Sequence, residues 1–161
     1  MVITLEGPEG AGKSSQIRRL SSYFQSLGIE VCTTREPGGS SFGPQVREIL
    51  LQSAAMEPLS ELFLFLADRA SHVQEVIRPA LAAGKIVLCD RYSDSTTVYQ
   101  GYARGGDLFW LRDLNYRATG GLVPSLTILL DLPVEVGLAR IHNHDRLDAE
   151  PLEFHQKVRE G

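Results

Sequence analysis

The amino-acid sequence predicts an α/β fold in which a parallel sheet is covered by helices on both faces. Four short apolar runs, at residues 2–5, 29–33, 86–89 and 126–130, are continuous rather than alternating in polarity. Continuous apolar runs of this length are typical of parallel strands that are buried on both faces. Segments with helical periodicity separate the runs, and this alternation indicates parallel strands joined by crossover helices.

Helices are predicted at residues 13–26, 43–51 and 58–83, as a pair within 94–119, and at 152–159. The longest has apolar residues at spacings of three and four, which places them on one helical face. It stops at Gly84, and glycine commonly ends helices. The segment at 140–151 is polar and lacks apolar periodicity, so we expect a mobile, lid-like excursion between two helices.

The composition is that of a single soluble domain spanning residues 1–161. Hydrophobic residues make up 43% of the chain and charged residues 22%, both ordinary for a globular protein. The formal net charge of −4 argues against a protein whose main task is to coat nucleic acid or an anionic membrane. We find no secretion signal and no apolar stretch of the ~18 residues that a membrane span needs. Cys32 and Cys89 lie within predicted strands, which suits a reducing cytoplasm.

The strongest motif lies between the first predicted strand and the first predicted helix. Residues 7–14 read GPEGAGKS and match G-x-x-x-x-G-K-[ST] in full, in the context that this motif requires. The backbone N–H groups of such a loop point at phosphate oxygens, the lysine reaches the β- and γ-phosphates, and the final hydroxyl binds magnesium. A Gly-rich turn that arose by chance is the alternative. The motif predicts a P-loop NTPase-type fold whose phosphate-binding residues are Gly7, Pro8, Glu9, Gly10, Ala11, Gly12, Lys13 and Ser14.

Two further features follow the third and second predicted strands. Asp90 closes the third strand, where P-loop proteins place a carboxylate that holds Mg²⁺ together with the loop hydroxyl, here Ser14. Arg91 can then bridge donor and acceptor phosphates, and the alternative is an ordinary Asp–Arg pair at the surface. Asp131, the rival carboxylate, is interpreted as mainly structural. Arg35 lies where ligands bind in open α/β sheets, although a Pro-Gly turn with a surface arginine is the plainer interpretation.

In their order and spacing these motifs resemble the bacterial thymidylate kinase family over essentially the whole chain. The resemblance rests on GPEGAGKSS near the start, TREPGG at 34–39, the Phe65…Arg69 helix, DRY at 90–92 and STTVYQG at 95–101. It implies an enzyme that transfers the γ-phosphoryl group of ATP, with Mg²⁺ as cofactor, to dTMP, giving dTDP and ADP in dTTP biosynthesis. It also implies a homodimer. The alternatives are a kinase for another deoxynucleoside monophosphate and a non-catalytic ATP-binding switch or assembly module.

The resemblance also assigns substrate-binding roles to residues of this sequence. Phe65 resembles the ring that stacks on thymine, Arg69 the donor to a thymine carbonyl, and Gln100 the amide that reads the base edge. Without the family, an aromatic side chain within the apolar run at 62–66 would be assigned to the core. The other implied contacts are Glu9 and Tyr99 beside the sugar, Arg35, Arg47 and Arg91 at the dTMP phosphate, and Pro37 and Ser95 in the same site.

Two departures from the family pattern lead to further expectations. Family members continue into another strand and helix beyond the point where this sequence stops, so we expect the strand at 126–130 to form a sheet edge. No basic side chain lies between Gly7 and Lys13, whereas kinases of this fold place an arginine at the transferring phosphoryl group. We therefore expect the lid to supply it from Arg140 or Arg146, unless Arg146 pairs with Asp148 instead.

A cluster of histidines near the end of the chain invites a zinc assignment. His142, His144 and His155, with Asp145, lack the ligand spacing of a structural zinc site. We therefore predict no zinc site there.

Overall fold

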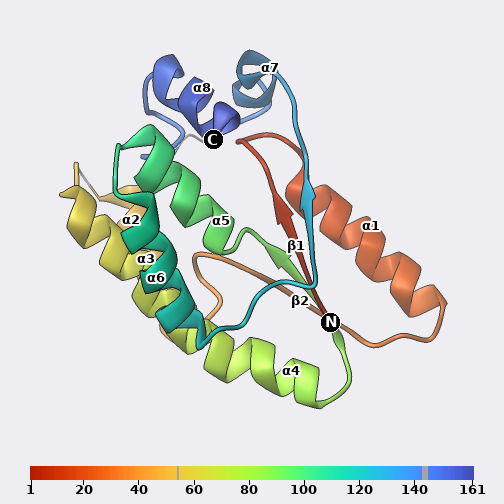
Figure 1. Cartoon of the computed structure of the whole chain (residues 1–161). Helices are drawn as coiled ribbons and strands as arrows, with labels where there is room; N and C mark the ends of the chain where they lie inside the picture. The colour runs from red at the N-terminus through yellow and green to blue at the C-terminus, as the bar shows by residue number, and fades with distance from the viewer. Residues whose placement is uncertain (54, 143–144) are drawn as a thin grey trace.

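The fold is a four-stranded parallel sheet with helices on both faces, as the sequence predicts (Figure 1). We analysed a computed structural model, which describes residues 1–53, 55–142 and 145–161. The strand order is β2-β3-β1-β4, and every pairing is parallel. The strands are β1 (Val2–Glu6), β2 (Val31–Arg35), β3 (Ile86–Asp90) and β4 (Leu126–Leu129).

The register of the strands gathers polar residues at one edge of the sheet. Leu5 of β1 and Arg35 of β2 both lie opposite Asp90 of β3, so the carboxyl ends of the three strands are level. Glu6 is the next residue of β1 at this edge. Ligands of open parallel sheets bind beyond the carboxyl ends of the strands, so this edge is where a site is expected.

Side chains alternate between the two faces of the sheet and meet different helices. On one face, Ile3, Leu5 and Leu88 pack with Ile17 of α1 (Lys13–Ser26). On the other face, Val2, Val87 and Cys89 pack against the turns that follow α3 (Pro58–His72). This alternation, with a period of two residues, is what allows one strand to serve two hydrophobic cores.

The outer strands differ from the sequence-based expectation of burial on both faces. Every residue of β1 is buried, but Leu126 and Leu129 of β4 are 50% and 68% exposed. Strand β2 is likewise only partly buried. Among the described residues β4 pairs with β1 alone, which confirms that it forms a sheet edge.

The long helix predicted at 58–83 is present as three successive segments, of which the first and last are α-helical and the middle one is π-helical. It runs through α3, a π-helical turn η1 (Val73–Ile77) and α4 (Arg78–Ala82). Pro79 lies just after the widened turn and has no N–H with which to continue the regular hydrogen-bond ladder. The helix therefore changes pitch locally, although the apolar period of its sequence is uniform.

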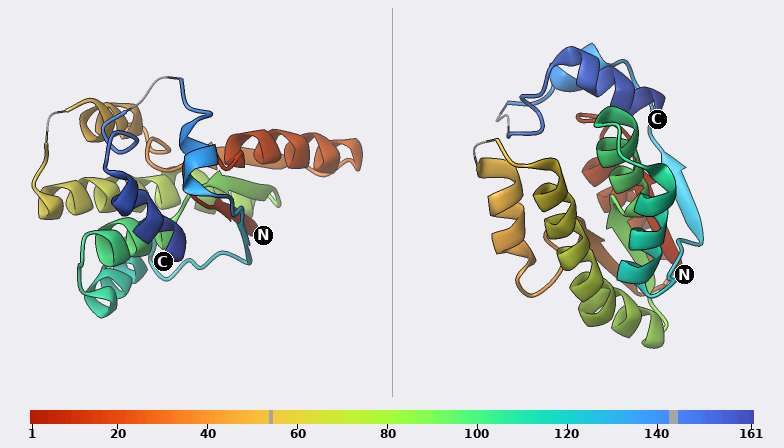
Figure 2. Two further views of the ribbon diagram at one scale, coloured as in Figure 1. Left: turned by 90° about the horizontal axis from the view of Figure 1, so that it is seen from above. Right: turned by 60° about the vertical axis from the view of Figure 1, so that its left-hand side comes forward.

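Of the remaining helices, some lie beside the sheet and others beyond the carboxyl ends of its strands (Figures 1 and 2). Helix α3 contacts both α2 (Gly43–Gln52) and α6 (Leu108–Thr119). Helices α7 (Val134–Leu138) and α8 (Leu152–Glu160) lie beyond the strand ends. The pair predicted within 94–119 is α5 (Ser93–Thr96), continued by η2 (Thr97–Ala103), and α6. No described helix combines the length and the apolar character that crossing a membrane requires.

Candidate active site

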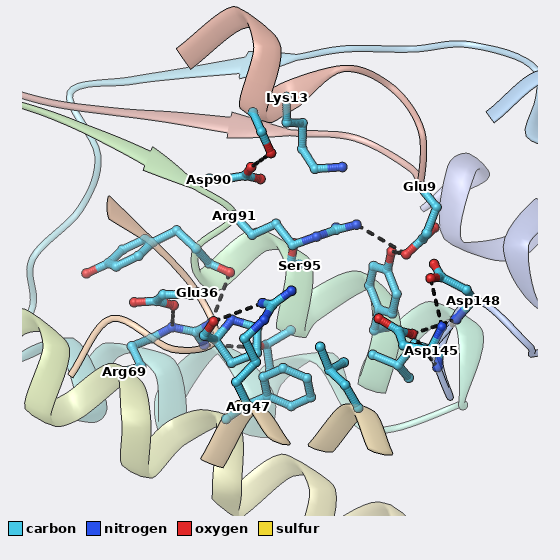
Figure 3. A pocket seen from close by; sticks show the side chains of 18 of the residues that line it. Glu9, Lys13, Glu36, Arg47, Arg69, Asp90, Arg91, Ser95, Asp145 and Asp148 are labelled. Carbon is cyan, nitrogen blue, oxygen red and sulfur yellow. Dashed lines mark hydrogen bonds and ion pairs between the residues drawn. The ribbon is translucent and has the colours of Figure 1, made fainter. Parts of the chain in front are cut away.

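A cavity of about 250 Å³ opens at the carboxyl edge of the sheet (Figure 3). Its wall is built from the loop after β1, the turn after β2, the end of β3, helices α2, α3 and η2, and part of the segment at 140–151. The predicted site residues that line it are Glu9, Gly10, Lys13, Ser14, Pro37, Arg47, Phe65, Arg69, Asp90, Arg91, Ser95, Tyr99 and Gln100.

The loop after β1 curls tightly around the amino end of α1. Gly10 has a φ of +68°, and a Cβ placed on it would lie 2.1 Å from the carbonyl oxygen of Gly137 in α7. Only glycine permits this conformation and this approach between two backbones. The Lys13 ammonium donates to the carbonyls of Gly7 and Pro8 at 2.9 and 2.8 Å. Burial, assisted by the positive charge of Arg91, lowers the pKa of Lys13 to about 7.

Ser14 and Asp90 form a pair of oxygen donors beside this loop. The Ser14 hydroxyl donates to the Asp90 carboxylate at 2.5 Å. A hydroxyl and a carboxylate are hard ligands of the kind that Mg²⁺ prefers, so the donor set fits the predicted metal. Within the described part of the chain, no group of three or more His, Cys, Asp or Glu side chains could hold a metal ion. His144 lies outside that part.

Arg91 lines the cavity, and the conformation and hydrogen bonds of the backbone around it fix its position. Its φ is +68°, an unusual value for a residue with a side chain. Its N–H donates to the Leu5 carbonyl at 3.0 Å, and the next N–H, of Tyr92, donates to the Glu6 carboxylate at 2.7 Å. Glu6 also accepts from the Ser95 hydroxyl at 2.6 Å. Burial raises the pKa of Glu6 to about 7.

Glu9 connects this loop to two other elements. Its carboxylate accepts from Arg91 Nη2 at 3.1 Å and from the Tyr99 hydroxyl, and it lies 3.4 Å from His155 Nδ1 of α8 (Figure 3 draws the arginine contact). Burial opposes its ionisation, but the contacts with His155 and Arg91 prevail and lower the pKa of Glu9 to about 2. The loop carboxylate is therefore ionised and held from three sides.

Phe65 and Arg69 form the far wall of the cavity. Phe65 is half-buried on the cavity wall, so its ring has a face available that a core residue would lack. Arg69 is only 1% exposed and makes four hydrogen bonds, to Glu36, Thr96, Asn115 and the Tyr92 carbonyl. A guanidinium has five N–H groups, so one on Nη2 is left to meet a ligand.

Gln100 is held by a carboxylate that the sequence analysis did not identify. Its amide nitrogen donates to Glu61 Oε1 at 2.8 Å, and both residues are buried. Glu61 also accepts from Arg104 Nε at 3.0 Å and from Arg146. Burial opposes ionisation of Glu61, but these hydrogen bonds and arginine charges lower its pKa. A carboxylate within the apolar stripe of α3 was the signal that could have indicated it.

The arginines predicted to bind the dTMP phosphate differ in whether they line the cavity. Arg47 lines the cavity and donates to the Pro37 carbonyl at 3.0 Å, and burial together with the charge of Arg35 lowers its pKa. Arg35 itself is exposed and is not among the residues of the cavity wall. Asp68, another residue missed from the sequence, holds the turn between them by accepting from the N–H groups of Gly38 and Ser40 at 2.6 and 3.2 Å.

The two predicted lid arginines lie at opposite ends of the site. Arg140 is exposed and donates to the Gly10 carbonyl of the loop at 3.1 Å. Arg146 donates from Nε to the Leu50 carbonyl at 2.9 Å and pairs with Glu61. The partner suggested by the sequence was Asp148, and the structure pairs Arg146 with Glu61 because the segment folds onto the ends of α2 and α3. Of the loop, Gly7, Pro8, Ala11 and Gly12 are outside the cavity wall, as are Arg140 and Arg146.

The same arrangement of elements occurs in known proteins. A family model described as thymidylate kinase matches residues 5–161. Thymidylate kinases from Synechococcus sp. (strain JA-2-3B'a(2-13)) and Thermomicrobium roseum are each 55% identical over 161 residues, covering 100% and 98% of this chain and 78% and 77% of the relatives. The crystal structure of thymidylate kinase from Ehrlichia chaffeensis has a TM-score of 0.84 at 35% identity, covering 99% of this chain and 82% of that one. The chain therefore belongs to the thymidylate kinase family.

Proposed function

We propose that the protein is a dTMP kinase, which transfers the γ-phosphoryl group of MgATP to dTMP and yields dTDP and ADP. The observation that carries the proposal is that one cavity holds both halves of this reaction. Lys13, Ser14 and Asp90 lie at one end, and Phe65, Arg69 and Gln100 lie at the other. A nucleotide switch that only binds ATP would have no need for the second group.

At the donor end, the loop of residues 7–14 binds the ATP phosphates through its backbone N–H groups and the Lys13 ammonium. Ser14 and Asp90 would hold Mg²⁺, which neutralises charge that develops on the β- and γ-phosphate oxygens when it is bound. The ammonium exchanges its contacts with the Gly7 and Pro8 carbonyls for phosphate oxygens. These groups orient the phosphate chain for transfer.

At the acceptor end, each group has a match in the chemistry of dTMP. Phe65 stacks on the flat base, and the remaining N–H of Arg69 and the Gln100 amide meet its polar edge. Glu9 and Tyr99 lie beside the sugar, with Ser95 and Pro37 completing the wall. Arg47 and Arg91 hold the phosphate, and Arg35, which is exposed beside Arg47, would join them when the substrate is present.

The reaction needs no covalent intermediate. A phosphate oxygen of dTMP attacks the γ-phosphorus directly, and the ADP oxygen leaves on the opposite side. The residues contribute position and positive charge, which are the main sources of rate enhancement in phosphoryl transfer. Arg91 is fixed between the two ends by the bond from its own N–H to Leu5 and by the bond from the next N–H, of Tyr92, to Glu6. Arg140 and Arg146 are the candidates for an arginine supplied by the segment at 140–151.

The proposal is tested by mixing the protein with MgATP and each nucleoside monophosphate in turn and following ADP release. We expect dTMP to give the largest kcat/KM. Lys13→Ala should nearly abolish turnover while the circular dichroism spectrum and Tm are kept, because the hydrogen bonds from the ammonium to described residues go to the loop's own carbonyls. ADP release that does not depend on an acceptor, or a different preferred acceptor, would overturn the assignment.

We also infer a homodimer formed through the face of α2, α3 and α6. Large apolar side chains are exposed there, with exposed fractions of 45% for Ile49, 50% for Phe63, 84% for Phe109 and 44% for Trp110. Helices α2 and α6 both contact α3, so these side chains lie on neighbouring helices, where a second copy of the chain would cover them. Light scattering should give a dimer mass that Phe109→Asp reduces to a monomer. The free cysteines Cys32 and Cys89 support a cytoplasmic location.

A further inference from the structure

The buried carboxylate of Glu61 determines which end of the Gln100 amide faces the cavity. From this geometry we infer that Glu61 is a specificity-determining positioning residue: it turns the Gln100 oxygen toward the base, so that the site accepts pyrimidines with an N–H at position 3 and rejects cytosine. The inference rests on the proposed function, because it concerns the base of the acceptor nucleotide.

The orientation of the amide follows from the chemistry of its partner. An amide has a donor end and an acceptor end of nearly equal size, and only its hydrogen bonds distinguish them. Glu61 is an ionised carboxylate, since Arg104 and Arg146 both contact it, and an ionised carboxylate can only accept. The Gln100 nitrogen must therefore face Glu61, at 2.8 Å. The reverse orientation would bring two acceptors together in a buried site with no hydrogen between them.

The other end of the amide is available to a ligand. Gln100 lines the cavity, and among the hydrogen bonds of the described residues none ends on its side-chain oxygen. Because the nitrogen is committed to Glu61, what Gln100 presents to the cavity is an acceptor. Phe65 and Arg69 line the same cavity, so a base stacked on the ring would bring its polar edge to this oxygen.

An acceptor at this position distinguishes the pyrimidines. Thymine and uracil carry an N–H at position 3, which can donate to the Gln100 oxygen. Cytosine has a lone pair at the same position, which would face that oxygen without a hydrogen. A buried acceptor that loses its donor is penalised, and this penalty is the source of discrimination. The methyl group that separates thymine from uracil is not read by this contact.

Glu61→Gln tests the inference because the glutamine side chain has the shape of glutamate but carries a hydrogen-bond donor as well as an acceptor. In the wild type, Oε2 of Glu61 accepts from Nη2 of both Arg104 and Arg146, whereas Oε1 accepts, among the described residues, from Gln100 and from Arg104 Nε. In E61Q the new amide oxygen therefore faces Nη2 of both arginines, and the new amide nitrogen faces Gln100 and the Arg104 Nε–H, which has to turn away from it. Gln100 then turns to accept from it and presents its own nitrogen to the base.

The readout is kcat/KM for dTMP, dUMP and dCMP, measured on the wild type and on E61Q. We expect the ratio for dCMP over dTMP to rise roughly 10- to 100-fold in E61Q, with the ratio for dUMP over dTMP unchanged. The matched control is Glu150→Gln, which removes the other carboxylate of Arg104 and leaves Gln100 untouched. It should leave both ratios as in the wild type. A merely structural role for Glu61 would lower all three values together.

The outcomes separate this inference from the proposed function. A wild type that does not use dTMP would refute the proposed function. A wild type that uses dTMP, with E61Q keeping the wild-type ratio of dCMP to dTMP, would refute the role of Glu61. If E61Q does not fold, Gln100→Met serves instead, because it removes both ends of the amide. It should weaken kcat/KM for dTMP and spare dCMP, and an equal loss for both would overturn the inference.

Discussion

At the residue scale, the question for Phe65 is whether its ring contacts the substrate or belongs to the core. It is half-buried on the cavity wall, within a helix whose other apolar residues include the buried Leu62 and Leu66. Phe65→Ala should therefore raise KM for dTMP by roughly 10- to 100-fold, as expected for a lost base-stacking contact of about 1–3 kcal/mol. KM for ATP should be almost unchanged in steady-state assays. Tyr23→Ala, which removes an exposed ring of α1, is the control, and unfolding of the Phe65 variant would instead assign that ring to the core.

Lys13 is a buried ammonium whose charge is only partly compensated before ATP binds. Its pKa of about 7 means that it is mostly neutral at pH 8, and phosphate oxygens should return the pKa toward the ordinary value of 10.5. We expect MgATP binding at pH 8 to take up roughly one proton, since binding restores the charged form. Calorimetry in two buffers of different ionisation enthalpy measures this uptake. Lys13→Arg, which stays charged, should show none, and equal heats for the wild type in both buffers would contradict the prediction.

Residues that belong to contiguous motifs were predictable from the sequence, whereas residues defined by distant partners were not. Lys13, Asp90 and Arg91 are placed by short patterns at strand ends, and the cavity brings them together. Glu61 meets Gln100 across 39 positions of the chain, so no local spacing indicates the pair. Its only signal was a charge within an apolar stripe, which identifies a buried network but not its members.

At the element scale, the segment at 140–151 carries two arginines with different contacts. Arg140 already lies on the loop at Gly10, and Arg146 is held by Glu61 and Leu50. The double variant Arg140→Ala, Arg146→Ala should lower kcat by roughly 10³-fold, the scale of an arginine that stabilises the transferring phosphoryl group. We expect Arg140→Ala alone to account for most of the loss. Single-turnover measurements report the chemical step, and a normal kcat in the double variant would show that neither arginine takes part.

Helices and strands were predictable where their sequence pattern is long. They were less predictable where packing against neighbouring elements determines their bounds or burial. The helix at 58–83 was predicted from its period, but the period gives no sign of the π-helical turn at Val73–Ile77, which lies just before Pro79. Helix α7 spans only Val134–Leu138, too short for a period to be recognised. Continuous apolar character predicted β4 correctly as a strand and its burial incorrectly, because burial depends on what packs beside it.

At the scale of the whole molecule, Glu6 links the stability of the fold to pH. Its carboxyl group is buried beside Tyr92, Ser95, Arg91 and Asp94, and its pKa is raised from 4.5 to about 7. The folded state thus binds a proton more tightly than the unfolded chain and is stabilised by it. This contribution to the free energy of unfolding is complete below pH 4.5 and is lost as the pH rises through 7. The total is on the order of 3 kcal/mol.

Urea unfolding of the wild type and of Glu6→Gln at several values between pH 4.5 and pH 7 measures this contribution. The wild type should lose stability relative to Glu6→Gln as the pH rises across this window, and the difference should level off only above pH 7. Glu9 does not interfere, because its pKa of about 2 confines its effect to more acidic solutions. A difference that is independent of pH would show that folding does not raise the pKa of Glu6.

The carboxylate of Glu61 can couple the binding of one substrate to the binding of the other. It holds the amide proposed to read the base and also Arg146, on the segment proposed to supply an arginine to the transferring phosphoryl group. When Arg146 leaves this carboxylate, the hold on Gln100 changes, and the affinity for the base changes with it. Because binding free energies around a closed cycle must sum to zero, the factor by which dTMP alters the affinity for ATP equals the factor by which ATP alters the affinity for dTMP. Cooperativity between two nucleotides would then depend on a side chain that contacts neither of them.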